Sequence, residues 1–580
     1  MPSRRDFLAL GAAAGAAAAL PAPLAAHATT LGVPPRLGAE AGRVADLTVD
    51  HLAHAEAVIG LEFRPEQREM MLPDVQARLT NYATIRDQEP ANPVVPALTL
   101  DLPEPPAPRE GMTVRIPTRV SFSPLEADLA FASLPELAAL LRARRVSSVE
   151  LTQMCLDRLK RFDPQLKAVV NLTEERALRT ARERDEDLAR GLDLGPLHGI
   201  PYGAKDLLAA DGAPTTWGAM PYRDQVLEGD AAVVELLEAA GAVLVAKLTL
   251  GALAWGDVWF GGRTNNPWNV EQGSSGSSAG PGAAVAAGLV PFAIGSETYG
   301  SIVSPSTRNG VTGHRPTFGR VSTRGAMALC WSLDKLGPMT RSAEDAAIVF
   351  DAIRDVDTVQ GDLGFPYDPH DDLRGVRLGY DPTLFAQAEG AGGDADRQSL
   401  AVLRDLGAEL VEIALPGGPE VSAVMDLTVT VEASAAFEGL TRTGRVDELV
   451  RQERFAWPNT FRHGRLIPAV EYLNAQRIRR RLVDETEAAL QQVHAMVAPS
   501  FAGSQLALTN VTGHPSVVVP NGFFPLGDAD ASTSAPDDGR RQPHSLTFIG
   551  RLYADHVPLR AATAYQRATA FHTMRPPIGG

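Results

Sequence analysis

The sequence predicts an α/β protein in which helices cover both faces of a mixed central sheet, with a helical extension at the N-terminus. The first observation behind this prediction is that helical patterns alternate along the chain with short apolar runs, which are typical of buried strands. The second is composition, because 44% of the 580 residues are hydrophobic and 21% are charged, a balance that supplies a large core. The length allows roughly three or four domains, or one large α/β unit with an extension.

The first 28 residues have the features of an export signal. Arg4-Arg5 precede Phe7-Leu8, and the run 8–20 contains only Ala, Gly and Leu. Ala26-His27-Ala28 fits the small-x-small site that a signal peptidase cuts. The two arginines resemble those of a twin-arginine signal, so we expect an exported protein, periplasmic or extracellular, without stable membrane insertion. A flexible alanine-rich tail and an uncleaved anchor are the alternatives, but the run and the prolines that follow it make a poor membrane span.

Residues 29–125 are predicted to form a helical extension and a proline-rich connector. Between residues 43 and 86, apolar positions recur with helical spacing, and we expect interruptions at Pro65 and Pro73. From Glu89 to Pro108 the chain is rich in proline, which is typical of an extended segment without a core of its own.

Residues 126–575 are predicted to form the α/β domain. A helix is expected to start near Ser133, and the segment Ser147 to Glu150 has the pattern of a capping box that opens another helix. Asp230 is expected to cap a helix that ends at Gly241. The polar stretch 524–545 is interpreted as a surface insertion. The remaining predicted elements are strands at 168–172, 242–246 and 289–294 and a helix at 173–190.

Charge and cysteine content exclude several classes of function. The formal net charge is −16, the isoelectric point is about 5.3, and basic clusters are few and short. An acidic body of this kind argues against binding of nucleic acid or anionic lipid. Two cysteines, Cys155 and Cys330, cannot form a disulfide scaffold or a cysteine-rich zinc site, and the sequence does not decide whether they pair. Cys330 is expected to be a buried packing residue.

The stretch 273–288, GSSGSSAGPGAAVAAG, is small-residue-rich and uncharged. Such composition is typical of a flexible linker. However, the stretch runs directly into the apolar segment 289–294, which is followed by a second Gly/Ser-containing segment, 295–302. A linker does not normally lead into a buried strand, so we expect these small residues to bring the backbone close to a ligand and to present its N–H groups.

Lys205 is the second unusual residue. Only five of the 54 basic residues are lysines, and Lys205 lies among small and apolar residues in the segment 199–206. A buried lysine loses part of its affinity for a proton and can act as a neutral base, which arginine cannot do. The alternative is a structural ion pair with Asp206 or another carboxylate.

Several motifs in the same order and at similar spacing resemble those of the amidase signature family. The resemblance covers residues 130–350 strongly and residues 495–575 weakly, and it implies the amidase signature fold. The segments that carry it are 199–206, 213–216, 265–269, the Gly/Ser stretch from Gly273, 295–302, 319–322, 332–334, 337–342, 513–515, 519–522 and 549–551.

The resemblance implies a catalytic triad of two serines and one lysine. Lys205 matches the base and Ser301 matches the nucleophile. Ser277, the first serine of the pair Ser277-Ser278, matches the bridging serine, and the peptide bond that precedes it is expected to be cis. A base of this kind is needed because a serine hydroxyl is a poor nucleophile until its proton is removed.

The resemblance also implies which groups bind the substrate and which reaction the enzyme catalyses. Backbone N–H groups of Thr298, Tyr299 and Gly300, continuing to Ser301, are expected to form an oxyanion hole, and Ser278 and Tyr299 to contact the substrate. The implied reaction is hydrolysis of a carboxamide through an acyl-enzyme, with release of ammonia or an amine. The ligand would be a small-molecule amide or carbamate, and no metal or organic cofactor is required. A homodimer is compatible with the sequence, which does not specify one.

The chain departs from the family pattern near the expected site. Tyr299 stands where family members commonly have glycine, which is expected to narrow the site or to shift the oxyanion geometry. None of the departures removes a member of the triad. The others are Val303 in place of a frequent Arg, Pro281 in place of Ser or Ala, and Ala279-Gly280 in place of a glycine pair.

Other functions fit parts of the sequence. Residues 276–280 also match G-x-S-x-G, the nucleophile elbow of α/β-hydrolases, with Ser278 as nucleophile. A histidine such as His314, His463 or His514 would complete its triad. However, such an elbow follows a buried strand, and here polar residues precede the motif.

The glutaminase subunit of the tRNA-dependent amidotransferase shares the amidase motifs, and a binding protein without catalysis is a further alternative. His51 and His54 lack the H-E-x-x-H pattern of a zinc site. Four tryptophans flank the motifs, and one or two are expected to line the acyl pocket: Trp217, Trp255, Trp259 and Trp331.

Overall fold

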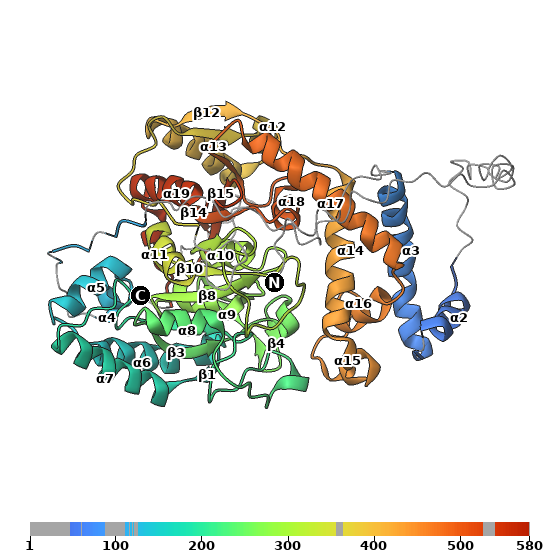
Figure 1. Ribbon diagram of the computed structural model, residues 1–580, viewed down its shortest axis with the longest axis horizontal. Helices are drawn as coiled ribbons and strands as arrows, with labels where there is room; N and C mark the ends of the chain where they lie inside the picture. The colour runs from blue at the N-terminus through green and yellow to red at the C-terminus, as the bar shows by residue number, and fades with distance from the viewer. Residues whose placement is uncertain are drawn as a thin grey trace, which may run out of the picture.

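The computed structural model describes residues 47–59, 61–87, 111–114, 116–118, 120, 126–354, 363–525 and 540–578. The predicted signal peptide, the proline-rich connector and most of the predicted insertion lie outside these residues. Within them the chain forms one α/β body with a group of helices at one side (Figure 1).

An eleven-stranded sheet forms the centre of the body, in the order β1-β3-β2-β8-β10-β9-β14-β15-β13-β11-β12. The sheet is mixed, because β2 runs parallel to both of its neighbours, β3 and β8, whereas β10 runs antiparallel to β8. The predicted fold class is therefore confirmed. The strands are β1 (Val169–Leu172), β2 (Pro201–Lys205), β3 (Val243–Leu248), β8 (Phe292–Glu297), β9 (Thr312–Arg315), β10 (Lys335–Thr340), β11 (Arg377–Tyr380), β12 (Glu409–Glu412), β13 (Ala495–Pro499), β14 (Ser516–Pro525) and β15 (Arg541–Gly550).

Helices cover both faces of this sheet, and each face has its own core. Alternate residues of β8 enter different cores, because successive side chains of a strand point to opposite faces: Phe292 and Ile294 join the larger core, and Ala293 joins the smaller one. The helices of the body are α4 (Glu126–Ala130), α5 (Leu134–Arg142), α6 (Ser148–Leu166), α7 (Glu174–Ala189), α8 (Ala232–Ala239), α9 (Ala279–Ala286), α10 (Val303–Asn309), α11 (Ala343–Ile353), α12 (Pro382–Gln387), α13 (Gly390–Asp405), α18 (Gln505–Val511) and α19 (His556–Thr569).

The predicted helix starts at Ser133 and Ser147 are confirmed. Each serine side chain accepts a hydrogen bond from the backbone N–H three residues later, and Glu136 and Glu150 complete the two capping boxes. The cap predicted at Asp230 is wrong. The helix α8 begins after Ala231, and the carboxylate of Asp230 instead accepts two hydrogen bonds from the guanidinium of Arg176.

The strand predicted at 289–294 begins later, at Phe292, and continues to Glu297. Leu289 and Val290 are buried directly after helix α9, and Pro291 has no N–H to donate to a strand. The polar end of the strand is tolerated in the interior because Ser296 and Glu297 both have hydrogen-bond partners there.

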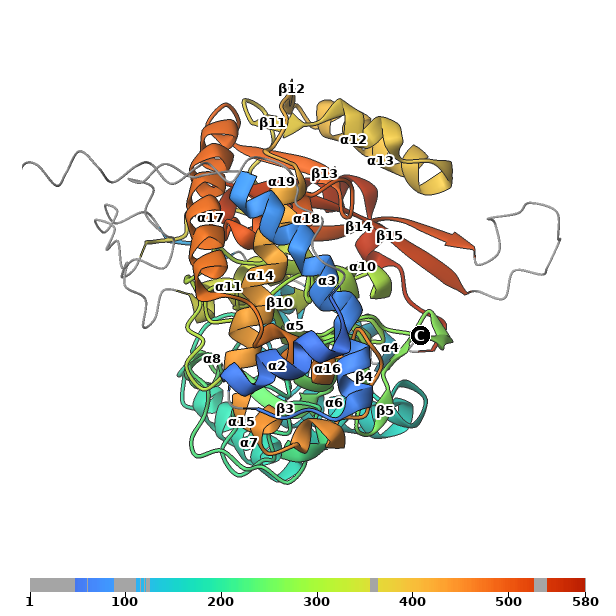
Figure 2. The ribbon, with the colours of Figure 1, turned by 90° about the vertical axis from the view of Figure 1, so that its right-hand side faces the viewer.

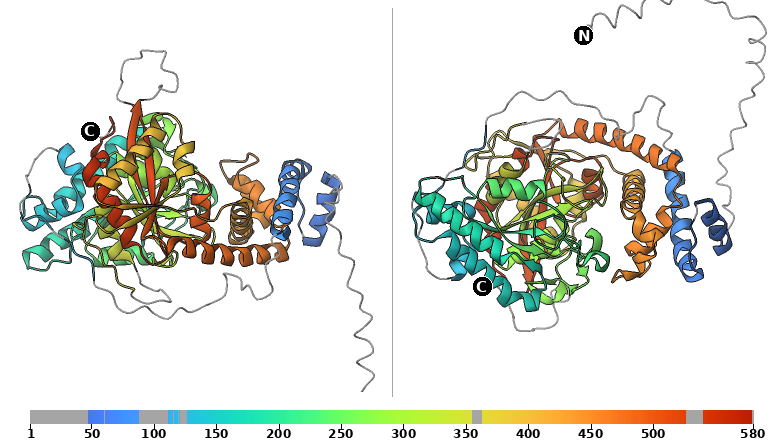
Figure 3. Two further views of the ribbon diagram at one scale, coloured as in Figure 1. Left: turned by 90° about the horizontal axis from the view of Figure 1, so that it is seen from above. Right: turned by 60° about the horizontal axis from the view of Figure 1, so that its bottom comes forward.

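The N-terminal extension consists of α2 (Val49–Ile59) and α3 (Pro65–Asp87), which pack at the side of the body (Figures 2 and 3). Pro65 opens α3, but the interruption predicted at Pro73 is wrong, because the helix continues through it. Packing compensates for the lost backbone hydrogen bond: Met71, close by on the same helix, is fully buried. Helix α3 lies against three helices of the later chain, which with the short α15 (Glu438–Arg442) form the side group: α14 (Pro419–Ala436), α16 (Trp457–Gly464) and α17 (Ala469–Leu490).

The predicted insertion at 524–545 overlaps two long strands. β14 reaches Pro525 and β15 begins at Arg541, and they pair antiparallel along their whole length. Their outer ends project from the body (Figure 2).

The helices of the described residues include none with both the length and the hydrophobicity that a membrane span requires.

Candidate active site

Lys205 ends strand β2, which lies between β3 and β8 in the sheet, and is completely buried. Its Nζ lies 2.7 Å from Ser277 Oγ, 3.1 Å from Ser278 Oγ and 2.8 Å from Ser296 Oγ. The ion pair with Asp206, considered as an alternative, is not formed, because Asp206 pairs with Lys247 at 2.8 Å. Lys205 therefore faces hydroxyl groups rather than a carboxylate.

Burial lowers the pKa of Lys205 well below its ordinary value, although the charges of Asp334 and Glu297 oppose the effect. A lysine with a lowered pKa is neutral over a wider pH range and can accept a proton. Its hydroxyl partners fit this state, since each of them can donate as well as accept a hydrogen bond.

The peptide bond between Gly276 and Ser277 is cis, as the family resemblance implied. The surrounding Gly/Ser stretch is closely packed and is not a linker. A Cβ on Gly276 would lie 1.9 Å from the carbonyl oxygen of Gly256, and one on Gly280 would lie 2.4 Å from the backbone nitrogen of Thr249. The stretch needs glycine at these positions because other backbone segments pass directly against it. It continues into the fully buried helix α9 (Ala279–Ala286).

Ser301 lies in the loop between β8 and α10. Gly300, just before it, has φ of +82°, a left-handed conformation that favours glycine. The backbone N–H of Ser278 donates to the carbonyl oxygen of Ser301 at 3.2 Å, so this loop and the segment that carries Ser277 are directly joined. Ser301 remains 9% exposed and lines a large cavity.

The loop 298–301 also presents free backbone donors. In the part of the chain that the structure describes, the N–H groups of Tyr299, Gly300 and Ser301 donate to no protein acceptor. Thr298 is fixed from the other side, because its hydroxyl donates to Asp334 at 2.6 Å. The arrangement has the donors that an oxyanion hole requires next to the hydroxyl of Ser301.

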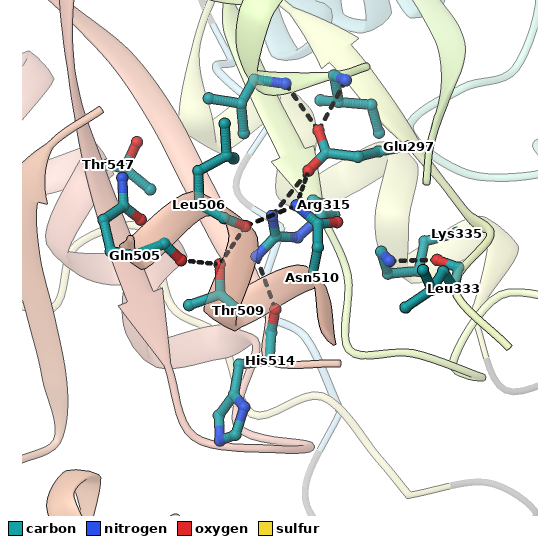
Figure 4. A network of polar contacts seen from close by, with 12 residues as sticks. Glu297, Arg315, Leu333, Lys335, Gln505, Leu506, Thr509, Asn510, His514 and Thr547 are labelled. Carbon is teal, nitrogen blue, oxygen red and sulfur yellow. Dashed lines mark hydrogen bonds and ion pairs between the residues drawn. The ribbon is translucent and has the colours of Figure 1, made fainter. Parts of the chain in front are cut away.

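Glu297 holds this loop in place, and the sequence analysis did not assign it a role (Figure 4). One carboxylate oxygen accepts the backbone N–H groups of Ile302 at 2.8 Å and Val303 at 2.9 Å. The other accepts from Arg315 and Asn510, each at 2.7 Å. Burial opposes ionisation, but Arg315 and the backbone donors outweigh it and lower the pKa of Glu297 to about 2. The signal for Glu297 in the sequence was its place in the segment 295–302, one of the segments that carry the family resemblance.

The cavity in front of Ser301 has a volume of about 1000 Å³. Tyr299, which was expected to narrow the site, lines it with its side chain half exposed. Phe455 and Phe501 are also exposed along the cavity, and Trp255 and Trp457 belong to its lining. Of the other tryptophans, Trp217 and Trp259 pack against aromatic neighbours, and Trp331 borders a separate cavity of about 240 Å³.

Ser278 does not fit the role of an elbow nucleophile or of a substrate contact. It is fully buried, is not part of the cavity lining, and its hydroxyl is bonded to the backbone of Ser296 and to Lys205. The strand before Ser278 is β7 (Asn269–Gly273), which is not part of the central sheet and pairs only with β6 (Asn265–Asn266). A second small sheet is formed by β4 (Val258–Trp259) and β5 (Gly262–Arg263). The candidate histidines have other neighbours: His314 lies beside Asp555, His463 beside Arg78 and His514 beside Glu487.

The cysteines and the N-terminal histidines also have no part in this site. Cys155 and Cys330 are both free and buried, and burial raises the pKa of each thiol, that of Cys155 to about 12. The ring of His54 bonds to the backbone of its own helix. No group of three or more His, Cys, Asp or Glu side chains suited to a metal ion occurs among the described residues.

The mixed sheet, the buried lysine with its serines, and the cis bond before Ser277 define a protein of the amidase signature class. Comparison with known sequences agrees. The model of the Amidase family matches residues 150–557, and the chain belongs to this family. The model of the twin-arginine translocation pathway signal sequence matches residues 1–21, which indicates export across the membrane.

Relatives within the family have different named activities. A glutamyl-tRNA(Gln) amidotransferase subunit from Chloroflexus aurantiacus is 34% identical over 491 residues, which cover 76% of this chain and 96% of the relative. Among solved structures, the peptide amidase of Stenotrophomonas maltophilia is 31% identical with a TM-score of 0.67, covering 78% of this chain and 99% of that one. The corresponding amidotransferase subunit from Thermotoga maritima is 26% identical with a TM-score of 0.61, covering 77% and 98%.

Proposed function

We propose that this protein is an exported amidase that hydrolyses the C–N bond of a carboxamide through an acyl-enzyme on Ser301. The observation that carries the proposal is the 2.7 Å contact between the buried Lys205 Nζ and Ser277 Oγ, beside the loop that holds Ser301. A neutral amine at this distance can remove a proton from the serine relay.

The proposed reaction begins with proton transfer. Lys205 takes the proton of Ser277, which takes the proton of Ser301, and Ser301 Oγ forms a bond to the carbonyl carbon of the amide. The N–H groups of Tyr299, Gly300 and Ser301 stabilise the negative charge that develops on the carbonyl oxygen. The C–N bond then breaks, and the nitrogen leaves as ammonia or an amine with a proton returned along the relay. Water attacks the acyl-enzyme by the same route and releases the acid.

Two features favour an amidase that acts alone over a glutaminase subunit of an amidotransferase. The match to a twin-arginine signal fits a protein that leaves the compartment where tRNA is charged. The net charge of −16 does not suit a protein that docks on nucleic acid. We propose that the substrate is a small-molecule amide and that the enzyme acts on it in the periplasm or outside the cell.

A test that needs no known substrate is labelling with a serine-directed fluorophosphonate, followed by mass spectrometry of the modified peptide. We expect the label on Ser301 in the wild type and its loss in Lys205→Ala. Lys160→Ala is the control, because Lys160 lies on the surface beside Glu174. A label on Ser278 would instead indicate an elbow-type hydrolase, and labelling of Ser301 that survives in Lys205→Ala would exclude the proposed relay.

A further inference from the structure

Part of the wall of the cavity comes from helices at the side of the body. Asp74 and Arg78 on α3, Asp426 on α14 and His463 on α16 all line the same cavity as Ser301. Helix α3 precedes the residues that match the Amidase family, which begin at residue 150. The N-terminal extension therefore supplies side chains to the cavity in addition to those of the residues that match the family.

Arg78 joins the three helices of this wall. It is only 7% exposed, and its Nη1 donates to the carboxylate of Asp426 at 2.6 Å. Its Nη2 lies 3.2 Å from Nδ1 of His463. Asn81, one turn further along α3, donates to the same oxygen of Asp426 at 2.9 Å. The position of the His463 ring is thus set by an arginine that is itself fixed by a carboxylate.

This contact also determines which ring nitrogen of His463 carries the proton. Arginine can only donate, so Nδ1 accepts, and the hydrogen of the neutral ring is on Nε2. Burial, with the charges of Arg78 and Arg454, lowers the pKa of His463 to about 3. The ring is therefore neutral over the physiological range, with a single tautomer.

Nε2 of His463 is an unused donor at the cavity surface. The side chain is only 4% exposed, yet no residue in the described part of the chain accepts a hydrogen bond from Nε2. Nε2 is accessible to solvent, and His463 lines the cavity. A buried imidazole with one nitrogen bound and the other open to a cavity is suited to bind an acceptor there.

The charges around this donor are balanced, which selects the kind of acceptor. Arg78 is paired with Asp426, and Arg454 is paired with Asp74 at 3.0 Å. A carboxylate on the ligand would meet the acidic as well as the basic member of each pair. A neutral oxygen, such as the carbonyl of an amide, fits a neutral N–H donor without adding charge.

We propose that His463 Nε2–H binds a carbonyl oxygen of the substrate remote from the scissile amide, so that the enzyme prefers amides extended by further acyl groups, as in N-acylated peptide amides. Arg78 is the positioning residue that fixes the donor. The cavity volume of about 1000 Å³ exceeds the need of a short aliphatic amide. The inference rests on the proposed function, because it assumes that the scissile amide lies at Ser301.

The test uses two amides that share the scissile group and the aromatic ring. These are N-acetyl-alanyl-phenylalaninamide and 3-phenylpropanamide, which lacks the remote carbonyls. Binding to the full-length mature protein is measured by calorimetry in the Ser301→Ala background, where turnover does not interfere. We expect His463→Phe to weaken the Kd of the dipeptide amide about tenfold relative to that of the short amide, the value of one hydrogen bond.

The matched control is His463→Gln, whose terminal amide nitrogen reaches the position of Nε2 and is expected to restore most of the preference. Three results would each overturn the inference. In the first, His463→Phe weakens the binding of both amides by the same factor; in the second, the Gln and Phe variants have the same preference; in the third, the dipeptide amide does not bind. For Arg78, nitrogen NMR of the His463 ring provides a specific readout. We expect only the Nε2–H tautomer in the parent protein and a mixture in Arg78→Met, and an unchanged tautomer would overturn the positioning role.

The experiments distinguish failure of this inference from failure of the proposed function. If fluorophosphonate labels Ser301 and amides are hydrolysed, but His463 has no effect on the preference, the inference fails and the proposed function stands. If the dipeptide amide binds in a manner that depends on His463, but Ser301 is not labelled and no amide is hydrolysed, the binding site stands and the proposed function fails.

Discussion

At the scale of single residues, Lys205 shows how burial prepares a base. Lysine is ordinarily protonated at neutral pH, with a pKa of about 10.4. In the interior Lys205 contacts three serine hydroxyls and no carboxylate, so the charged form is poorly compensated and the pKa falls. An arginine at this position would remain charged and could not accept a proton.

We therefore expect Lys205→Arg to lower the rate of ammonia release by about 10²–10⁴-fold. In the wild type, kcat/KM should rise with pH as Lys205 loses its proton and should level off below the ordinary pKa of lysine, because burial lowers that value. The measurement is a pH–rate profile of both proteins, with Lys160→Arg as the surface control. A variant with an unchanged profile would contradict the role of Lys205 as the base.

Glu297 is the residue whose charge stabilises the loop around the site. Its pKa is lowered to about 2 in the folded protein, so it binds its proton less tightly there than in the unfolded chain. The ionised form therefore stabilises the fold above the unfolded pKa of about 4.3, and this contribution is lost as pH falls from there toward 2.

We expect Glu297→Gln to lower the free energy of unfolding by about 3 kcal/mol at pH 7, because Arg315 is left buried without its counter-charge. The difference from wild type should be smaller at pH 3 than at pH 7. Urea unfolding at the two pH values provides the measurement. Glu174→Gln, in an exposed pair with Lys160, should change stability by less than about 1 kcal/mol.

The contrast between these two residues shows what the sequence can reveal about the site. Lys205 was found because a rare lysine among small and apolar residues is locally unusual, and the family resemblance supplied Ser277 and Ser301. Glu297 was not found because its importance lies in Asn510 and Arg315, which are distant in sequence and brought to it only by the fold. The same holds for Arg78 and His463, whose contact joins positions 385 residues apart.

At the scale of elements, the Gly/Ser stretch that leads into α9 and includes its first turn depends on close approach of backbones. Its composition alone is that of a linker, and only its continuation into an apolar segment indicated otherwise. In the structure Gly280 lies directly against two other segments, since a Cβ there would meet Thr249 N at 2.4 Å and Ala168 O at 2.5 Å. Both contacts are to backbone atoms, which cannot rotate away as a side chain would.

We expect Gly280→Ala to reduce the free energy of unfolding by about 1–3 kcal/mol, through the overpacking that a methyl group causes here. The matched control is Gly439→Ala in helix α15, where a Cβ would meet nothing within 4 Å. That change should be neutral or slightly stabilising, because alanine favours the helix over glycine. Both variants can be compared by urea unfolding, and equal effects would show that the contact at Gly280 is not limiting.

The elements predicted correctly depend on residues close together in the sequence, and those predicted wrongly depend on residues far apart. The capping box predicted at Ser147 involves residues only three positions apart and is present, and the start predicted near Ser133 also has a capping box. Asp230 has the side chain of a cap, but Arg176 from another helix binds it more strongly. Two other differences have the same origin: the strand spans residues 292–297 and not 289–294, and α3 continues past Pro73. Both depend on packing partners that are distant in the sequence.

At the scale of the whole molecule, the sheet is completed by the end of the chain. Strands β14 and β15 lie between β9 and β13, so the C-terminal part of the sequence joins the two halves of the sheet. Both strands are buried over most of their inner length. The eleven-stranded sheet is therefore complete only when the C-terminal strands are in place.

The twin arginines of the signal provide the test at this scale. We expect the double variant Arg4→Lys, Arg5→Lys to abolish export and to leave the protein in the cytoplasm of a host that has the twin-arginine route, because the signal is read by a receptor and not by charge alone. Cell fractionation followed by immunodetection gives the distribution, and fluorophosphonate labelling shows whether the retained protein is folded. Arg43→Lys, outside the residues 1–21 that match the signal, is the control and should be exported normally. Export of the double variant at the wild-type level would show that another route carries the protein. Retention of a protein labelled on Ser301 would show that folding does not depend on export.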